Sequence, residues 1–237
     1  MVPIDMRFQD VWIIIPAFNE ASIIGDVISD VRSVFPNVVC VDDGSHDATA
    51  ELALQAGAYV VPHPVNLGQG AAIQTGVEYA RSRPGARVFA TFDADGQHQV
   101  KDVVRMIDRL DTDGADLVVG TRFANPDAHA VTHTPPLKRI ILRAAAFLSP
   151  QSRALGLTDA HNGLRVFNKK VADELDLTMN GMSHAGEFIS LAYENHWRVV
   201  EEPVEILYTD YSKSKGQPLL NGVNIVFDGL LRRRLSR

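Results

Sequence analysis

Residues 88–98 read VFATFDADGQH, and this stretch decides the fold class of the chain. It begins with an apolar run that suits a buried strand, and it ends in two aspartates and a glycine turn. Similar short apolar runs recur along the first half of the chain, with helix-like segments between them. This alternation predicts an α/β fold in which a mostly parallel central sheet is flanked by helices. The other strands predicted in this half are residues 11–15, 38–41, 58–61 and 117–119.

Helices are predicted between these runs. Asn19 is the expected N-cap of the first helix, and Pro36 follows that helix as a stop signal. Residues 47–56 and 69–82 form two further predicted helices, closed by glycine or by proline and glycine. The apolar positions at helical spacing in the first helix are Ile24, Val27, Ile28, Val31 and Phe35.

The regular pattern loosens after residue 123, and we expect a single domain over residues 1–237 with two unlike halves, about 8–123 and about 124–237. The second half begins with a long loop rich in Pro, His and Asn, which is followed by a basic apolar helix. Its predicted elements are the loop 124–136, the helix 137–148, a strand at 164–167, a helix at 187–195 and a strand at 197–207.

The composition excludes several classes of protein. The 237 residues are 46% hydrophobic and 22% charged, as in folded globular chains and unlike disordered or fibrous ones. The net charge of −6 argues against general nucleic-acid binding. Cys40 is the single cysteine, which excludes internal disulfides and cysteine-cluster zinc sites. No apolar run approaches the roughly 20 residues of a membrane-spanning helix, and residues 1–10 lack a secretory pattern, so we expect a cytoplasmic location.

Polar residues follow the predicted strands, at the sheet edge where open parallel sheets bind their ligands. Asp93 and Asp95 lie two residues apart at a strand end, and Gln97 adds a third oxygen. Such ligands suit a hard cation such as Mg²⁺ or Mn²⁺, with a nucleoside diphosphate as its natural partner. Asp42 and Asp43 end a neighbouring strand and strengthen this hypothesis. The alternative is that these aspartates only bond the backbone of their own turns.

A second candidate site is the run of small residues around Gly68 and Gly70, which leads into a predicted helix. Backbone N–H groups there are able to approach a base or a phosphate closely. The run lacks the lysine and hydroxyl residue of a P-loop and the spacing of a dinucleotide fingerprint. The alternative is an ordinary turn that packs against its helix.

Five short motifs follow one another along the chain: IPAFNE at 15–20, VDDGS at 41–45, NLGQG at 66–70, DADGQH at 93–98 and GTRF at 120–123. In this order they resemble the motifs of the family 2 inverting glycosyltransferases, in particular the dolichyl-phosphate mannose synthase-like enzymes that load polyprenyl phosphates. The match is close over the first half of the chain. It continues more loosely through HNGLR at 161–165 and YSKSK at 211–215.

The resemblance implies a GT-A fold, with a nucleotide-sugar-binding half at about 8–123 and an acceptor-binding, membrane-facing half at about 124–237. It implies that Asp93, Asp95 and Gln97 bind Mg²⁺ or Mn²⁺, and that Asp95 and Arg122 are catalytic. The residues implied to bind the nucleotide sugar are Pro16, Ala17, Asn19, Glu20, Asp43, Gly68, Gly70, Asp93, Ala94 and Asp95.

The implied reaction transfers a sugar, with inversion, from a nucleoside diphosphate to a polyprenyl phosphate. An acceptor phosphate is already anionic at neutral pH, so cations are needed more than a strong base. This chain departs from the family pattern at Leu142, Asn162 and Ser212–Lys213, which leaves the acceptor site and the sugar open. The candidate acceptor-phosphate ligands are Arg122, Lys138, Arg139, Lys213 and Lys215.

The basic helix 137–148 and the basic tail 230–237 suggest peripheral attachment to the inner face of the membrane, since each basic residue near an anionic surface contributes roughly 1 kcal/mol. A separate membrane-protein partner is compatible with this hypothesis. The donor stays open between UDP-linked sugars, slightly preferred, and GDP-mannose. Two other functions also stay open: a family 2 transferase with a soluble acceptor, and a catalytically silent nucleotide-binding regulatory subunit.

Overall fold

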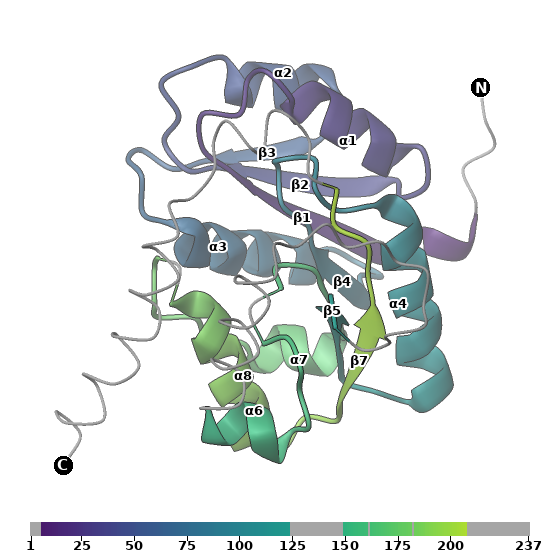
Figure 1. Ribbon diagram of the computed structural model, residues 1–237. Helices are drawn as coiled ribbons and strands as arrows, with labels where there is room; N and C mark the ends of the chain where they lie inside the picture. Colours follow the sequence, from purple (N-terminus) through teal and green to yellow (C-terminus); the bar gives the residue numbers. More distant parts are fainter. Residues whose placement is uncertain (1–5, 124–148, 161, 182, 208–237) are drawn as a thin grey trace, which may run out of the picture.

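The computed structural model describes residues 6–123, 149–160, 162–181 and 183–207 (Figure 1). The predicted loop 124–136, the basic helix 137–148 and the tail 230–237 lie outside the described residues. The same holds for four of the proposed acceptor ligands: Lys138, Arg139, Lys213 and Lys215.

A seven-stranded sheet forms the centre of the molecule, in the order β3-β2-β1-β4-β6-β5-β7. Strand β6 runs antiparallel to both of its neighbours, and every other pairing is parallel. The predicted α/β class with a mostly parallel sheet is therefore confirmed. The strands are β1 (Val11–Ala17), β2 (Asn37–Asp42), β3 (Tyr59–Pro62), β4 (Val88–Thr91), β5 (Leu117–Thr121), β6 (Arg165–Asn168) and β7 (Val199–Pro203).

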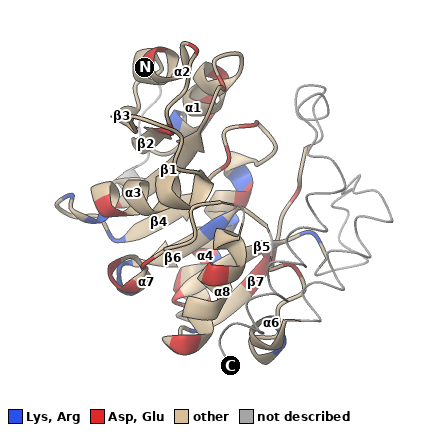
Figure 2. Ribbon diagram, turned by 90° about the vertical axis from the view of Figure 1, so that its left-hand side faces the viewer, with Lys and Arg blue, Asp and Glu red and all other residues tan. Residues whose placement is uncertain are grey.

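Helices cover both faces of the sheet (Figure 1). Helices α1, α2 and α4 pack on one face, and α3, α7 and α8 on the other. Acidic residues are coloured along α3, α7 and α8 in Figure 2, and Glu78, Asp173 and Glu194 among them are exposed, as expected for amphipathic surface helices. The helices are η1 (Met6–Phe8), α1 (Ile24–Arg32), α2 (Thr49–Gln55), α3 (Gln69–Arg81), α4 (Val100–Asp113), α6 (Pro150–Ala154), α7 (Lys169–Glu174) and α8 (His184–Glu194).

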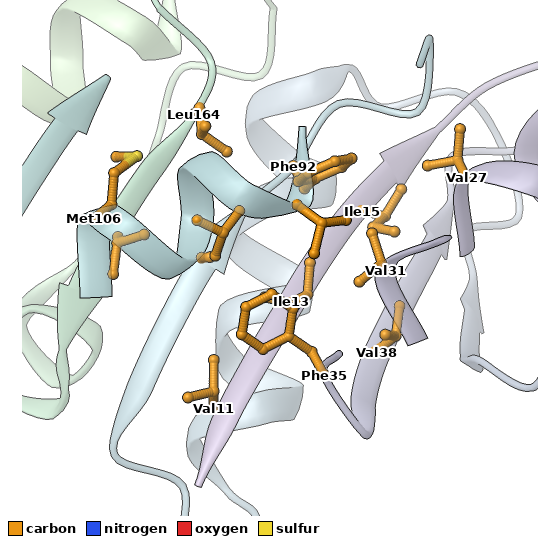
Figure 3. Packing of buried hydrophobic residues seen from close by; sticks show 14 of the residues in the cluster. Val11, Ile13, Ile15, Val27, Val31, Phe35, Val38, Phe92, Met106 and Leu164 are labelled. Atoms are coloured by element: carbon orange, nitrogen blue, oxygen red, sulfur yellow. The ribbon is translucent and has the colours of Figure 1, made fainter. Parts of the chain in front are cut away.

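Strand β1 is buried on both faces, which explains why its sequence is almost continuously apolar. Ile13 and Ile15 join the cluster beneath α1 and α4, where Phe35 and Val31 pack beside them (Figure 3). Trp12 and Ile14 point to the opposite face and join the cluster beneath α3. This alternation follows from the two-residue period of a strand.

The first turn after β1 differs from the prediction for Asn19. Ile23, not Asn19, is the N-cap residue of α1, because residues 20–24 first form a turn in which Glu20 O accepts the N–H groups of Ile23 and Ile24. Asn19 has a φ of 54° and its Oδ1 accepts the His46 N–H at 2.9 Å. The predicted cap is therefore wrong, and Asn19 instead joins the loops after β1 and β2.

We expect Gly76→Ala in α3 to lower the free energy of unfolding by about 1–2 kcal/mol. A Cβ at this position would overlap the Ile14 Cγ2 methyl and lie 3.3 Å from Val41 Cγ2. Overpacking costs about 1–3 kcal/mol, whereas the gain in helix propensity recovers at most about 1 kcal/mol. Urea denaturation measures the difference.

Gly25→Ala is the matched control, because Gly25 also lies in a helix and a Cβ added there would meet no atom of the described residues outside that helix within 4 Å. We expect this variant to be more stable than the native chain by about 0.5–1 kcal/mol. Equal stabilisation of both variants would contradict close packing of α3 on the sheet.

Candidate active site

The candidate site lies at the carboxyl ends of β1, β2, β4 and β5, where the amino end of the antiparallel β6 also arrives. Parallel strands bring the loops that follow them to one edge of the sheet. The Asp43 N–H donates to Ala17 O at 2.8 Å, which joins the loops after β1 and β2. The predicted residues 16–20, 42–43, 93–97 and 122 therefore share this edge.

The carboxylate of Asp93 is held from two sides. Gln69 Nε2 donates to its Oδ1 at 3.0 Å, and His98 Nε2 lies 2.9 Å from its Oδ2. Asp95 is tied less tightly: its Oδ1 accepts the Gln97 N–H at 3.0 Å, in the turn bond that the alternative hypothesis foresaw. Both aspartates thus belong to one loop, with Asp93 fixed by side chains and Asp95 by the backbone.

The two carboxyl groups titrate differently. Burial raises the pKa of Asp95 to about 6, and the nearby charge of Asp93 contributes to this rise. Burial also acts to raise the pKa of Asp93, but the charge and hydrogen bond of His98, together with the charges of His184 and Arg165, outweigh it, so the pKa of Asp93 is lowered. The pair therefore concentrates negative charge that a cation would stabilise.

Gly163 makes room for the Asp93 carboxylate. A Cβ at residue 163 would overlap Asp93 Oδ2, so a larger residue here would displace this carboxylate from its present position. The Gly163 carbonyl accepts a hydrogen bond from Thr91 Oγ1 at 2.6 Å, which holds the backbone there. Residues 162–163 therefore form a wall of the site next to the aspartate loop.

The loops after β2 and β3 are joined at Asp43, which is 2% exposed. Its Oδ1 accepts from His63 Nδ1 at 2.7 Å and from the Leu67 N–H at 2.9 Å, and its Oδ2 accepts the Gly68 N–H at 2.7 Å. His63 Nε2 in turn lies 2.9 Å from Thr75 Oγ1. Asp43 therefore fixes the loop between β3 and α3 to the end of β2.

The loop after β1 is fixed in a similar way. The Asn19 N–H donates to Ser45 Oγ at 2.9 Å, and the Glu20 N–H donates to Thr49 Oγ1 at 2.8 Å. Pro16 and Ala17 precede this loop as the buried last residues of β1. Ala94, which lies between the two aspartates, is also buried.

Gly68 and Gly70 face a segment of the chain itself. A Cβ on Gly68 would overlap Asn180 O, and one on Gly70 would overlap Met179 O. Gly68 also has a φ of 98°, which favours glycine, and the Gly70 N–H donates to Asn180 O at 2.8 Å. The sequence indicated a close approach at these glycines, and backbone 179–180 makes one; their contact with a nucleotide stays a prediction.

Arg122 follows β5 and forms a two-bond ion pair that the sequence did not predict. Its Nε donates to Asp159 Oδ2 at 2.6 Å, and its Nη2 donates to Asp159 Oδ1 at 2.7 Å. The side chains are 11% and 1% exposed, so the pair is largely buried. Its position at the strand end agrees with the predicted site, and its role toward phosphate stays a prediction.

Arg165 and His184 are two further buried residues absent from the predicted set. Arg165 is 0% exposed, and within the described part of the chain its Nε and Nη1 have no hydrogen-bond partner. Burial lowers the pKa of Arg165 to about 10, although the charges of Asp93 and Asp159 act to raise it. Burial and then the charge of Arg165 lower the pKa of His184 to about 4. A charged residue that opens an apolar strand was the available signal for Arg165.

The sheet, its helices and the acidic carboxyl edge are those of a glycosyltransferase with a GT-A fold. The chain belongs to glycosyl transferase family 2, whose family model matches residues 12–176. This family membership confirms the resemblance that the five motifs indicated.

Three similar proteins illustrate the relationship. UDP-N-acetylglucosamine–dolichyl-phosphate N-acetylglucosaminyltransferase of Methanococcus voltae is 28% identical, over 92% of this chain and 93% of its own. Polyprenol monophosphomannose synthase of Mycolicibacterium smegmatis is also 28% identical, and the match covers 97% of this chain and 90% of that protein. The third is glucosyl-3-phosphoglycerate synthase from Mycobacterium tuberculosis, in a crystal structure with Mn²⁺, UDP and glucosyl-3-phosphoglycerate. It superposes with a TM-score of 0.70 at 17% identity, and the superposition covers 92% of this chain and 76% of that chain. This similarity supports the fold.

Two features are absent from the described residues. None of their helices combines the length and the apolar character needed to cross a membrane. The same residues contain no group of three or more His, Cys, Asp or Glu side chains arranged to hold a metal ion.

We expect Asp43→Asn to lower the free energy of unfolding by about 2–4 kcal/mol. Three buried groups donate hydrogen bonds to the Asp43 carboxylate, and in the variant one of them would face an amide NH₂ in place of an acceptor oxygen. Hydrogen exchange should locate the effect at the Leu67 and Gly68 amides, which donate to Asp43.

Asp30→Asn on the exposed side of α1 is the control, and it should leave both stability and exchange unchanged. Retained protection at Leu67 and Gly68 in the Asp43 variant would refute the anchoring role of this carboxylate.

Proposed function

We propose that this chain transfers a sugar from a nucleoside-diphosphate sugar to a polyprenyl phosphate, inverting the anomeric carbon, and that it requires Mg²⁺ or Mn²⁺. The observation that carries the proposal is the aspartate pair at the carboxyl edge of the sheet, the edge at which Arg122 follows β5. The two relatives named for dolichyl-phosphate and polyprenol substrates support the acceptor class.

The residues at the edge fit a divalent cation. Asp93 and Asp95 repel one another, and a cation between their carboxylates would relieve the repulsion. Gln97 would add an amide oxygen, and the diphosphate and water would complete the ligand set, as is usual for Mg²⁺. When bound, the ion supplies Lewis-acid neutralisation of the leaving diphosphate.

The nucleotide sugar would lie along the loops after β1, β2 and β3. The hydrogen bonds from the Asn19 N–H to Ser45 Oγ and from the Gly68 N–H to Asp43 Oδ2 already fix these loops, so the entropic cost of ordering them is met during folding. The proposed contacts with the nucleotide sugar are Pro16, Ala17, Asn19, Glu20, Asp43, Gly68, Gly70, Asp93, Ala94 and Asp95.

In the proposed reaction a phosphate oxygen of the acceptor attacks the anomeric carbon as the bond to the nucleoside diphosphate breaks. The acceptor oxygen is already anionic, so no side chain has to remove a proton from it. Arg122 would hold the acceptor phosphate, helped by Lys138, Arg139, Lys213 and Lys215 from outside the described residues. The described chain ends at Leu207, whose N–H donates to Gln97 O at 2.9 Å, next to the aspartate loop.

A UDP-linked donor is slightly preferred over GDP-mannose, and the name of the Methanococcus voltae relative supports this choice. We further propose that residues 8–123 bind the donor and residues 124–237 the acceptor, at the inner face of the membrane. The basic segments 137–148 and 230–237 would attach the protein there, alone or with a membrane-protein partner.

We expect Asp95→Asn to reduce transfer at least about 100-fold, because the variant keeps the shape and the Gln97 N–H acceptor but loses a cation-binding charge. The assay supplies radiolabelled UDP-sugars or GDP-mannose with a polyprenyl phosphate and Mg²⁺ or Mn²⁺, and measures label in an organic-soluble product. Chelation with EDTA should abolish the same signal, and the product should have the anomeric configuration opposite to that of the donor.

Asp26→Asn on the exposed side of α1 serves as the control and should retain native activity. Transfer to a water-soluble acceptor without lipid would replace the proposed acceptor class. Donor binding without turnover on any acceptor would identify a silent subunit instead.

A further inference from the structure

We infer that Asp159 and Glu201 are positioning residues that fix Arg122 for the acceptor phosphate, an inference that rests on the proposed function. The three residues come from different parts of the fold: Arg122 follows β5, Asp159 lies between α6 and β6, and Glu201 belongs to β7. Consecutive hydrogen bonds join the three.

The first step is the contact between Asp159 and Arg122. Both oxygens of one carboxylate accept from the guanidinium, at 2.6 and 2.7 Å, which sets the plane of the group as well as its position. Asp159 Oδ2 also accepts the backbone N–H of Arg122 at 3.1 Å. One carboxylate therefore restrains the main chain and the side chain of the same residue.

The second step is the anchoring of Asp159 by Glu201. Glu201 Oε1 accepts the N–H groups of Thr158 and Asp159, at 2.7 and 3.0 Å. Its Oε2 accepts from Thr158 Oγ1 at 2.8 Å. A single glutamate thus accepts three hydrogen bonds from two consecutive residues, which holds the short loop before β6 to the edge strand β7.

The third step is the connection of β5 to β7 and to the segment at Thr158. In the register of β5 and β7, Val119 pairs with Glu201 and Thr121 with Pro203. The Thr121 hydroxyl lies 2.9 Å from Thr158 Oγ1 and also accepts the Phe123 N–H at 3.1 Å. Thr121, directly before Arg122, is therefore bonded to the segment that Glu201 holds, and its hydroxyl also binds the Phe123 N–H on the other side of Arg122.

The Asp159 charge has two effects on Arg122. A guanidinium with a fixed plane meets a phosphate without a further ordering cost, which favours the transition state. The same negative charge weakens the general attraction of Arg122 for anions, which permits release of the product. Loss of the charge should therefore reduce turnover more than it reduces binding of the acceptor.

The test measures steady-state kinetics of Asp159→Asn and Glu201→Gln, with farnesyl phosphate as the acceptor probe. We expect kcat to fall about 10- to 100-fold in both variants, with the KM for farnesyl phosphate unchanged or lower in Asp159→Asn. Glu202→Gln is the matched control: this neighbouring glutamate of β7 faces Arg105 of α4, at 3.6 Å, and should keep native values of kcat and KM. Native kcat in both test variants would overturn the inference.

A second measurement separates this inference from the proposed function. In NMR spectra of the free protein, the Nε–H signal of Arg122 should be protected from exchange in the native chain and in Glu202→Gln, and lost in Asp159→Asn and Glu201→Gln. This pattern in a chain that does not use farnesyl phosphate would overturn the proposed acceptor and retain the positioning of Arg122. Unchanged Nε–H protection in both test variants, each verified as folded by thermal unfolding, would overturn the positioning itself.

Discussion

The direction of β6 is the constraint on which the rest of the site depends. Because this strand runs antiparallel between β4 and β5, its amino end lies at their carboxyl ends. A parallel strand in the same place would have delivered residues 159–163 to the opposite edge of the sheet. The insertion places Gly163 against Asp93 and allows Asp159 to meet Arg122.

Concentrating charge at one edge of the sheet is energetically costly, and the fold offsets this cost with specific partners. Asp93, Asp159 and Glu201 each accept at least two hydrogen bonds or close contacts. Asp95 is the exception, since burial and Asp93 raise its pKa to about 6 while the Gln97 N–H is its recorded donor. Removing water from a carboxylate is expensive unless charges or donors replace that water. The edge is therefore organised before a substrate arrives, and of these four acids Asp95 has the fewest hydrogen-bond donors.

The loop between β3 and α3 is held by hydrogen bonds and by close packing of backbone. Asp43 supplies acceptors for two successive amides of this loop, while segment 179–180 occupies the volume that side chains at residues 68 and 70 would need. A larger residue at either glycine would push apart two stretches of backbone, which cannot move as a flexible side chain can. The glycines thus couple the first half of the chain to the segment before α8.

Local pattern in the sequence determined the strands, the helices α1, α2, α3 and α8, and the residues of the acidic edge, because buried strands leave apolar runs and ligand-binding edges follow them directly. The sequence also predicted that Gly68 and Gly70 approach a base or a phosphate, whereas in the structure backbone 179–180 lies against them. Only the tertiary structure decided that Asn19 does not cap α1, that β6 runs antiparallel, and that Asp159 pairs with Arg122. These features depend on contacts between residues far apart in the chain, 37 positions for Arg122 and Asp159, and such contacts arise from packing and direction, which a local pattern does not encode.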